Sequence, residues 1–101
     1  MQIMEPQVID LIVVYTERVE ECRAFYTGLG LTFQKEQHGA GPEHFSATLG
    51  STVFELYPAG DGPPTGRLRL GFTLPSGPGR EPGRRTVTDP DGRTVDLRIS
   101  A

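Results

Sequence analysis

The sequence is poor in cysteine and has no long hydrophobic run. Cys22 is the only cysteine among 101 residues, which excludes an intrachain disulfide and any zinc site built from several cysteines. The longest mainly apolar stretch, Val8 to Tyr15, contains Asp10 and is far shorter than the roughly 20 residues that span a bilayer. No basic segment followed by an apolar one stands at the N-terminus, so we expect no membrane partner and a cytoplasmic location.

Positive charge is also in short supply. The net charge is -3 at pH 7, which leaves too little positive field to attract a nucleic acid. Hydrophobic residues make up 36% of the chain, enough for one core, but 101 residues are too few for two independent cores. We therefore expect one domain over residues 1–101 and no nucleic-acid partner.

The first half predicts the order strand, helix, strand, strand, strand. Val8 to Tyr15 is rich in β-branched residues, and Thr16 follows it as a good helix N-cap. Apolar residues then recur at helical spacing from Val19 to Leu29, and Gly28 and Gly30 supply a stop. The remaining segments are a weak strand over 31–37, a loop over 38–43, and strands over 44–49 and 52–57 joined by a two-residue turn.

The second half predicts strands without a helix. Residues 58–66 are dense in proline and glycine and suit a connection. Residues 67–74 and 93–99 alternate polar and apolar side chains, as strands with two unlike faces do. Between them, residues 75–83 hold three prolines and three glycines, which excludes a helix there. Asp89-Pro90-Asp91-Gly92 predicts a turn before the last strand.

Three segments together carry a family resemblance. YTERVEECRAFYTGLGL, VFELYP and DPDGRTVDL resemble the glyoxalase, bleomycin-resistance and dioxygenase superfamily, also called the vicinal oxygen chelate superfamily. The resemblance implies an α+β fold of paired βαβββ modules whose concave faces form a binding cleft. Here module one would cover residues 7–58, a linker 59–66, and a truncated module two 67–101, which lacks its helix and one strand.

Metal-dependent members of the superfamily place one ligand in each of four strands. By the resemblance these positions fall on Leu11, Glu55, Arg69 and Asp96. Leucine has no lone pair, and arginine offers only donors, so two of the four ligands are lost. We therefore expect no metal and no cofactor, because two carboxylates beside a fixed positive charge make a poor site.

Arg69 suggests an electrostatic replacement for the metal. Placed between Glu55 and Asp96, it would satisfy two carboxylates that otherwise repel each other. This charge cluster could simply hold the two modules together. Alternatively Arg69 or Arg67 anchors an acidic or carbonyl-bearing ligand, and Glu55 acts as acceptor or general base. No second catalytic partner is evident, so the catalytic residues stay unassigned.

Strand alternation predicts the rest of the cleft lining. It would be aliphatic and phenolic, which suits an aromatic molecule, although the same residues could be ordinary core contacts. These residues are Leu11, Val13, Tyr15, Val53 and Tyr57, all on the face of Glu55. His44 begins a strand at the cleft edge and could hydrogen-bond a ligand, while His38 and the arginines at 80, 84 and 85 suit a solvated surface.

The absence of a helix from the second half leads us to expect a second subunit. If Arg69 and Asp96 face the cleft, an apolar set faces the opposite side, where the absent helix would have covered it. That set is Leu68, Leu70, Phe72, Val95, Leu97 and Ile99. Because such a patch rarely stays open to water, we expect a homodimer, with or without exchange of modules.

The favoured function is that of a metal-independent binding protein of the bleomycin-resistance type. It would sequester a hydrophobic or aromatic small molecule in the cleft between modules, without catalysis. Two alternatives stay open: a lyase, isomerase or dioxygenase of the same superfamily, and a degenerate module that acts only as a dimeric partner without a ligand.

Overall fold

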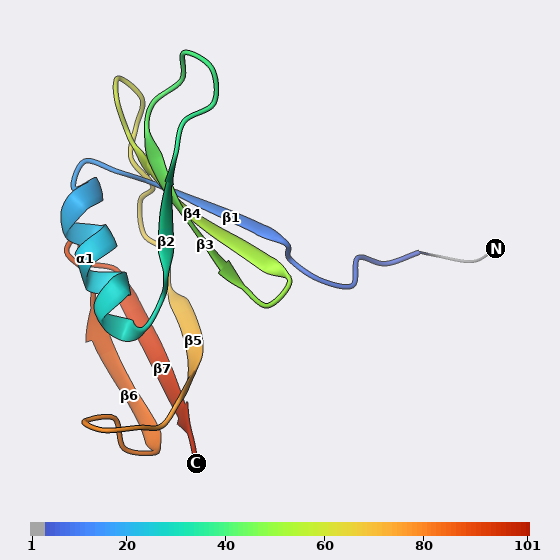
Figure 1. Ribbon diagram of the computed structural model, residues 1–101, viewed down its shortest axis with the longest axis vertical. Coiled ribbons are helices and arrows are strands. Elements are labelled where there is room, and N and C mark those ends of the chain that lie inside the picture. Colours follow the sequence, from blue (N-terminus) through green and yellow to red (C-terminus); the bar gives the residue numbers. More distant parts are fainter. Residues whose placement is uncertain (1–3) are drawn as a thin grey trace.

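The computed structural model describes residues 4–101, which form two small sheets and, within that range, one helix (Figure 1). Sheet A has the strand order β1-β4-β3-β2 and sheet B the order β5-β7-β6. The first half comprises β1 (Leu11–Thr16), α1 (Val19–Leu29), β2 (Phe33–Glu36), β3 (His44–Leu49) and β4 (Thr52–Pro58). The second comprises β5 (Leu70–Pro75), β6 (Gly83–Thr88) and β7 (Thr94–Ser100).

Module one has the predicted βαβββ order. β1 runs parallel to β4, and β4 pairs with β3 in a hairpin that closes at Leu49 and Thr52. Gly50 in this turn has φ of 61°, which glycine adopts without steric strain, so the predicted two-residue turn is confirmed. β1 starts at Leu11, three residues later than the sequence pattern indicated.

The ends of α1 differ from the prediction. The N-cap residue is Arg18, and Thr16 is the last residue of β1, although the Thr16 hydroxyl accepts a hydrogen bond from the Arg18 backbone N–H. Gly28 lies within the helix, and Gly30 ends it in the left-handed region at φ of 116°. Arg80, from the loop between β5 and β6, donates to the carbonyl oxygen of Leu29 at 2.7 Å and satisfies one free helix carbonyl.

Module two contains three strands and, over its described residues 67–101, no helix. β5 runs parallel to β7, and β7 pairs with β6 in an antiparallel ladder. The absence of the helix and of one strand agrees with the sequence analysis. β6 itself was not predicted, because the segment GRRTVT is polar and almost entirely exposed and so lacks an apolar face.

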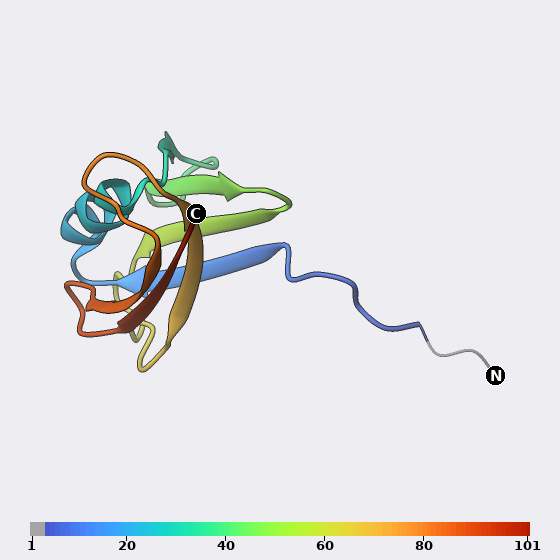
Figure 2. The same cartoon turned by 90° about the horizontal axis from the view of Figure 1, so that it is seen from below.

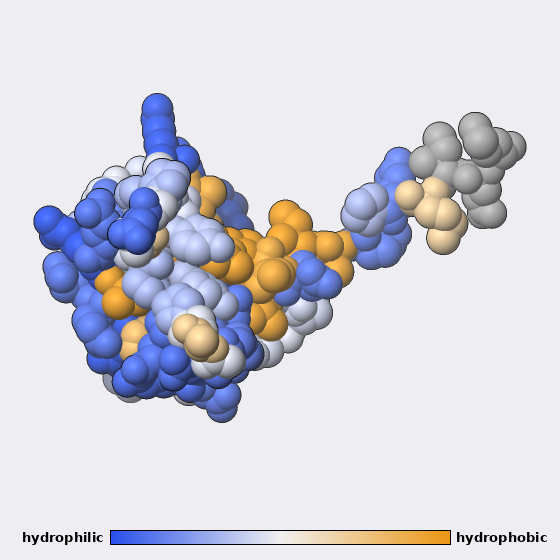
Figure 3. Space-filling model, turned by 90° about the horizontal axis from the view of Figure 1, so that it is seen from above, coloured by the Kyte–Doolittle hydropathy of each residue, from blue (hydrophilic) through white to orange (hydrophobic). Residues whose placement is uncertain are grey.

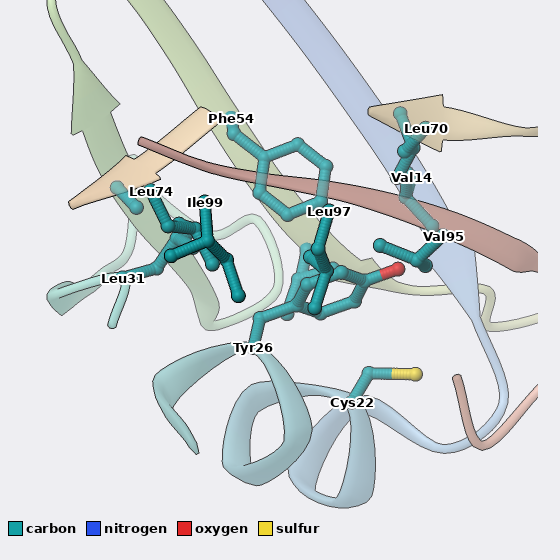
Figure 4. Close-up of a cluster of buried hydrophobic side chains, with 12 residues drawn as sticks. Val14, Cys22, Tyr26, Leu31, Phe54, Leu70, Leu74, Val95, Leu97 and Ile99 are labelled. Carbon is teal, nitrogen blue, oxygen red and sulfur yellow. The ribbon is translucent and has the colours of Figure 1, made fainter. Parts of the chain in front are cut away.

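One helix covers the inner faces of both sheets. The rings of Tyr26 of α1, Phe54 of β4 and Phe72 of β5 contact one another, with centroids 5.2 Å apart for Tyr26 and Phe54, 5.9 Å for Tyr26 and Phe72 and 6.0 Å for Phe54 and Phe72. Figure 4 shows Tyr26 pointing from α1 into this cluster of buried side chains. Leu70, Val95, Leu97 and Ile99 are buried in this same core. The expectation that they form an exposed patch requiring a second subunit is therefore wrong, because α1 takes the place of the missing helix.

A buried carboxylate joins α1 to the turn between β6 and β7. Asp89 accepts a hydrogen bond from the Tyr26 hydroxyl at 2.7 Å and pairs with the guanidinium of Arg93 at 2.9 Å. Its other oxygen accepts the backbone N–H groups of Asp91 and Arg93. The sequence analysis took Asp89 only as a turn residue, but its side chain closes the contact between the two modules.

Burial and hydrogen bonding set the ionisation of this contact. Burial works against the charged form of Asp89, but the hydrogen bonds from Tyr26 and Arg93 outweigh it and lower the pKa of this carboxyl. Burial, followed by the bond to Asp89, raises the pKa of Tyr26. Burial also raises the pKa of the Cys22 thiol, which lies fully buried 3.6 Å from an oxygen of Asp91, so this residue is structural rather than nucleophilic.

None of the helices in the described part of the chain is long and apolar enough to cross a membrane.

Tyr26→Phe should lower the free energy of unfolding by about 1 to 3 kcal/mol, because Asp89 loses a donor in a place that water cannot reach. Urea unfolding followed by circular dichroism measures the change. Tyr15→Phe is the matched control, since Tyr15 is 45% exposed, and it should leave the unfolding midpoint unchanged. Equal midpoints for the two variants would contradict a structural role of the Tyr26 hydroxyl.

Candidate ligand-binding site

The outer face of sheet A is the face turned away from α1. Along β1 and β4 the buried positions are Val14, Phe54 and Leu56, so the alternate residues lie on the other side. This outer face carries six of the residues predicted to line a cleft: Leu11, Val13, Tyr15, Val53, Glu55 and Tyr57. Leu11 is 52% exposed, so the face is open to solvent in the single chain.

Aromatic rings cross the outer face of sheet A from strand to strand. Tyr15 and Tyr57 have ring centroids 5.7 Å apart, and the His44 ring stacks on Tyr57 at 4.0 Å with an interplanar angle of 11°. Tyr15, Tyr57 and His44, on β1, β4 and β3, form what we call the aromatic row. The row offers flat, polarisable surface on which a planar ligand can stack.

Carboxylates border the aromatic row at its His44 end. His44 Nε2 lies 3.4 Å from Glu36 and 3.8 Å from Glu55, whose side chain is 14% exposed. The other ring nitrogen, Nδ1, donates to the carbonyl oxygen of Pro42 at 3.2 Å. The sequence analysis placed His44 at the cleft edge, whereas its side chain is 1% exposed and part of the packed face.

The outer face of sheet B is strongly cationic. Arg69 donates from Nε and from a terminal nitrogen to the two oxygens of Asp96, at 2.7 and 2.9 Å. Thr86 donates to Asp96 as well, and the register places Arg98 and Arg84 side by side on the same face. The bonds from Arg69 lower the pKa of Asp96, and the bonds to Asp96 raise the pKa of Arg69.

The two outer faces do not meet within one chain. Each sheet turns its inner face to the shared core, so the outer faces point away from the core and from each other (Figure 2). Arg69 is therefore not placed between Glu55 and Asp96 as expected: it pairs with Asp96 inside sheet B, while Glu55 lies beside His44 in sheet A. A single chain supplies two half-sites rather than a closed cleft.

The superfamily's metal position does not fit these residues. Leu11 offers no donor atom, and Arg69 occupies both oxygens of Asp96 with its own guanidinium. Glu55 and Asp96, the two carboxylates that remain, stand on the outer faces of different sheets. A metal ion at this position would have too few ligands from one chain.

Three of the hollows on the surface lie on or beside the faces described above. One of about 310 Å³ lies on the outer face of sheet B beside Arg69 and Arg98, and one of about 390 Å³ lies beside Arg67, Asp91 and Arg93. The third, of about 440 Å³, opens between the inner faces near Phe54 and is lined by apolar side chains, glycines and threonines without a charge. None of the predicted ligand residues lines this third hollow.

The sequence analysis missed part of the cationic face. Arg98 lies against Gly71, where a side-chain carbon would come within 3.6 Å of its guanidinium, and Arg84 is its register partner in β6. Arg98 could have been found from the alternation of β7 with Asp96. Arg84 could not, because its strand carries no apolar period.

Solved structures show what this architecture is. An Agrobacterium tumefaciens lactoylglutathione lyase has a TM-score of 0.62 at 14% identity, with 95% of this chain and 96% of that chain covered. A Bacillus anthracis protein attributed to the glyoxalase family gives 0.65 at 17% identity, covering 99% and 100%. The antibiotic-binding protein TnmS3 of Streptomyces sp. CB03234 gives 0.60 at 20% identity, covering 97% and 99%.

The fold is that of the glyoxalase superfamily. It is the paired-module α+β fold with a shortened second module, as the sequence motifs indicated. No family model and no curated protein sequence matches the chain. At identities this low the similarity shows the fold and not a function, so a function has to be argued from the side chains of this chain.

Arg69→Ala should leave the urea unfolding midpoint unchanged, because the Arg69 side chain is 67% exposed and exposed ion pairs contribute little to stability. Arg93→Ala should lower the free energy of unfolding by about 3 to 5 kcal/mol, because it leaves the buried charge of Asp89 without its positively charged partner. The pair of variants separates an arginine available to a ligand from one that holds the fold. A destabilised Arg69→Ala variant would mean that Arg69 is structural.

Proposed function

We propose that the protein binds a small aromatic, acidic molecule without catalysis, in a cleft formed where the outer face of sheet A meets the outer face of sheet B of a second copy. The observation that carries this proposal is the unlike chemistry of the two open faces. Sheet A offers the aromatic row, and sheet B offers arginines that the fold does not need. Binding would use no metal at the superfamily's position, for lack of ligands there.

The aromatic row supports a planar ligand. Tyr15 and Tyr57 present their rings along one line, with the buried His44 ring stacked against Tyr57, and Val13 and Val53 supply apolar surface beside them. A guanidinium can bind a carboxylate or a carbonyl with two parallel hydrogen bonds, so Arg69, Arg84 and Arg98 would orient the polar end of the ligand. Small-molecule sites combine these two ingredients, a mainly apolar wall and a few fixed polar groups.

A second copy of the chain fits the open face of sheet A. Figure 3 shows hydrophobic residues gathered where the N-terminal segment leaves the body, and Val8, Ile9 and Leu11 in this part of the chain are exposed. A chain with an uncovered apolar face gains stability by association.

Charge complementarity favours sheet B as the surface that sheet A meets. The outer face of sheet A carries Glu36 and Glu55 and the outer face of sheet B carries three arginines against one aspartate. In a dimer with two-fold symmetry, the outer face of sheet A of each copy would lie opposite the outer face of sheet B of the other copy. The two contacts would form two equivalent clefts. This dimer rests on the outer faces and not on the inner apolar set, which α1 already covers.

Sedimentation velocity at micromolar concentration should show a particle of twice the 11.0 kDa chain mass. Val13→Asp should shift the chain to monomer, because it places a desolvated charge beside Glu55 in the interface. Thr27→Asp, on the exposed side of α1, is the matched control and should stay dimeric. A wild-type protein that stays monomeric at high concentration would contradict the shared cleft.

Naphthalene-2-carboxylate is a suitable probe, since it combines a planar ring system with one carboxylate. Isothermal titration calorimetry should show that Arg69→Gln weakens the binding of this probe by about tenfold, because the carboxylate of the probe loses one charged hydrogen-bonding partner. Arg18→Gln removes an exposed arginine of the N-cap and should bind as the wild type does. If Arg69→Gln leaves the affinity unchanged, the probe binds elsewhere, for example in the apolar hollow near Phe54.

A further inference from the structure

Three potential metal-ligating side chains meet at one end of the outer face of sheet A. Glu36 is the last residue of β2, His38 lies in the loop that follows, and His44 is the first residue of β3. The ligand atoms of these three side chains all lie within 4.8 Å of one another. The family positions discussed above include none of the three.

The His44 ring is oriented as in a metal ligand. Its Nδ1 must carry the proton, because the neighbouring carbonyl oxygen of Pro42 can only accept. In the neutral ring Nε2 then bears a lone pair, and this buried atom has no hydrogen-bond partner among the described residues. Metal-binding histidines commonly donate their second ring N–H to a backbone carbonyl in this way, which fixes the tautomer and the ring orientation.

The spacing around Nε2 leaves room for a cation. Glu36 and Glu55 approach it to 3.4 and 3.8 Å, and His38 Nε2 lies 3.9 Å from Glu36. These distances are too long for good hydrogen bonds. Two ligands that are each about 2.1 Å from a tetrahedral zinc ion lie about 3.4 Å from each other, so the separations suit ligands around a shared ion.

We propose that Glu36, His38 and His44 bind a divalent transition metal ion of the zinc type. Two imidazole nitrogens and one carboxylate oxygen are a donor set that such ions prefer, whereas magnesium and calcium prefer oxygen donors alone. Glu55, 14% exposed beside Nε2, adds negative charge that offsets the charge of the ion. Three protein ligands leave the fourth position to water.

The ion would fasten the loop between β2 and β3 to the sheet. This loop folds on itself through bonds from Gly41 N–H to His38 and from Gln37 to Gly41. The exposed pair Lys35–Glu43 and the bond from His44 to the Pro42 carbonyl oxygen connect it to the strands. Bound metal would also hold the His44 ring against Tyr57, at the end of the aromatic row.

Isothermal titration calorimetry of the metal-stripped, untagged chain with zinc chloride and with cobalt chloride tests the site. One ion should bind per chain, cobalt should give the visible absorption band of a tetrahedral complex, and magnesium should not bind. Zinc should also raise the thermal unfolding midpoint, because it binds the folded chain in preference to the unfolded one.

His38→Ala is the decisive variant. The His38 side chain is 72% exposed, so its loss leaves the fold intact, and zinc affinity should fall by at least about tenfold. Glu43→Gln removes a carboxylate of the same loop that points to Lys35, and it should bind zinc as the wild type does. Glu36→Gln should weaken binding as His38→Ala does.

The proposal is overturned if neither zinc nor cobalt binds the wild type. It is equally overturned if His38→Ala and Glu36→Gln bind zinc with unchanged affinity. Binding of naphthalene-2-carboxylate to the metal-stripped chain, measured separately, keeps this outcome distinct from that of the proposed function.

Discussion

The buried carboxylate of Asp89 is the interaction on which the rest of the structure depends. A charge can stay in a protein core only when its lone pairs are satisfied, and here Tyr26, Arg93 and two backbone N–H groups do so. Because Tyr26 stands on α1 and Asp89 on the turn before β7, the hydrogen bond fixes where module two lies relative to the helix. Arg80 adds a second contact one turn further along, at the C-terminal end of α1.

This constraint explains how a module without a helix can be stable. The apolar residues of β5 and β7 need cover, and α1 provides it because Tyr26 contacts both Phe54 of sheet A and Phe72 of sheet B, which also contact each other. One helix then serves two sheets. A consequence is that both outer faces are turned to the outside, where a single chain cannot bring them together.

The outer faces carry the side chains on which both proposals rest. On sheet A, Tyr57 stacks on His44, and the carboxylates beside that ring give the face both an aromatic and an anionic part. On sheet B, Arg69 is held in place by Asp96 without being needed by the core. A site for an aromatic anion and a site for a metal ion can coexist there, since the first uses the centre of the aromatic row and the second its edge.

The sequence by itself determined the elements whose cause is local: the β-branched strand β1, the apolar stripe of α1, the glycine turn after Leu49, and the absence of a helix between β5 and β6, where proline and glycine forbid one. It also determined which side chains share a face of a strand, because alternation is a property of the backbone. Only the tertiary structure decided what each face meets. The cover of Val95 and Leu97 by α1, the burial of Asp89 and the pairing of Arg69 with Asp96 alone depend on contacts between distant segments, and no local period in the sequence records those contacts. The gathering of Glu36, His38 and His44 depends on the register of the β2–β3 hairpin, which pairs Glu36 with His44.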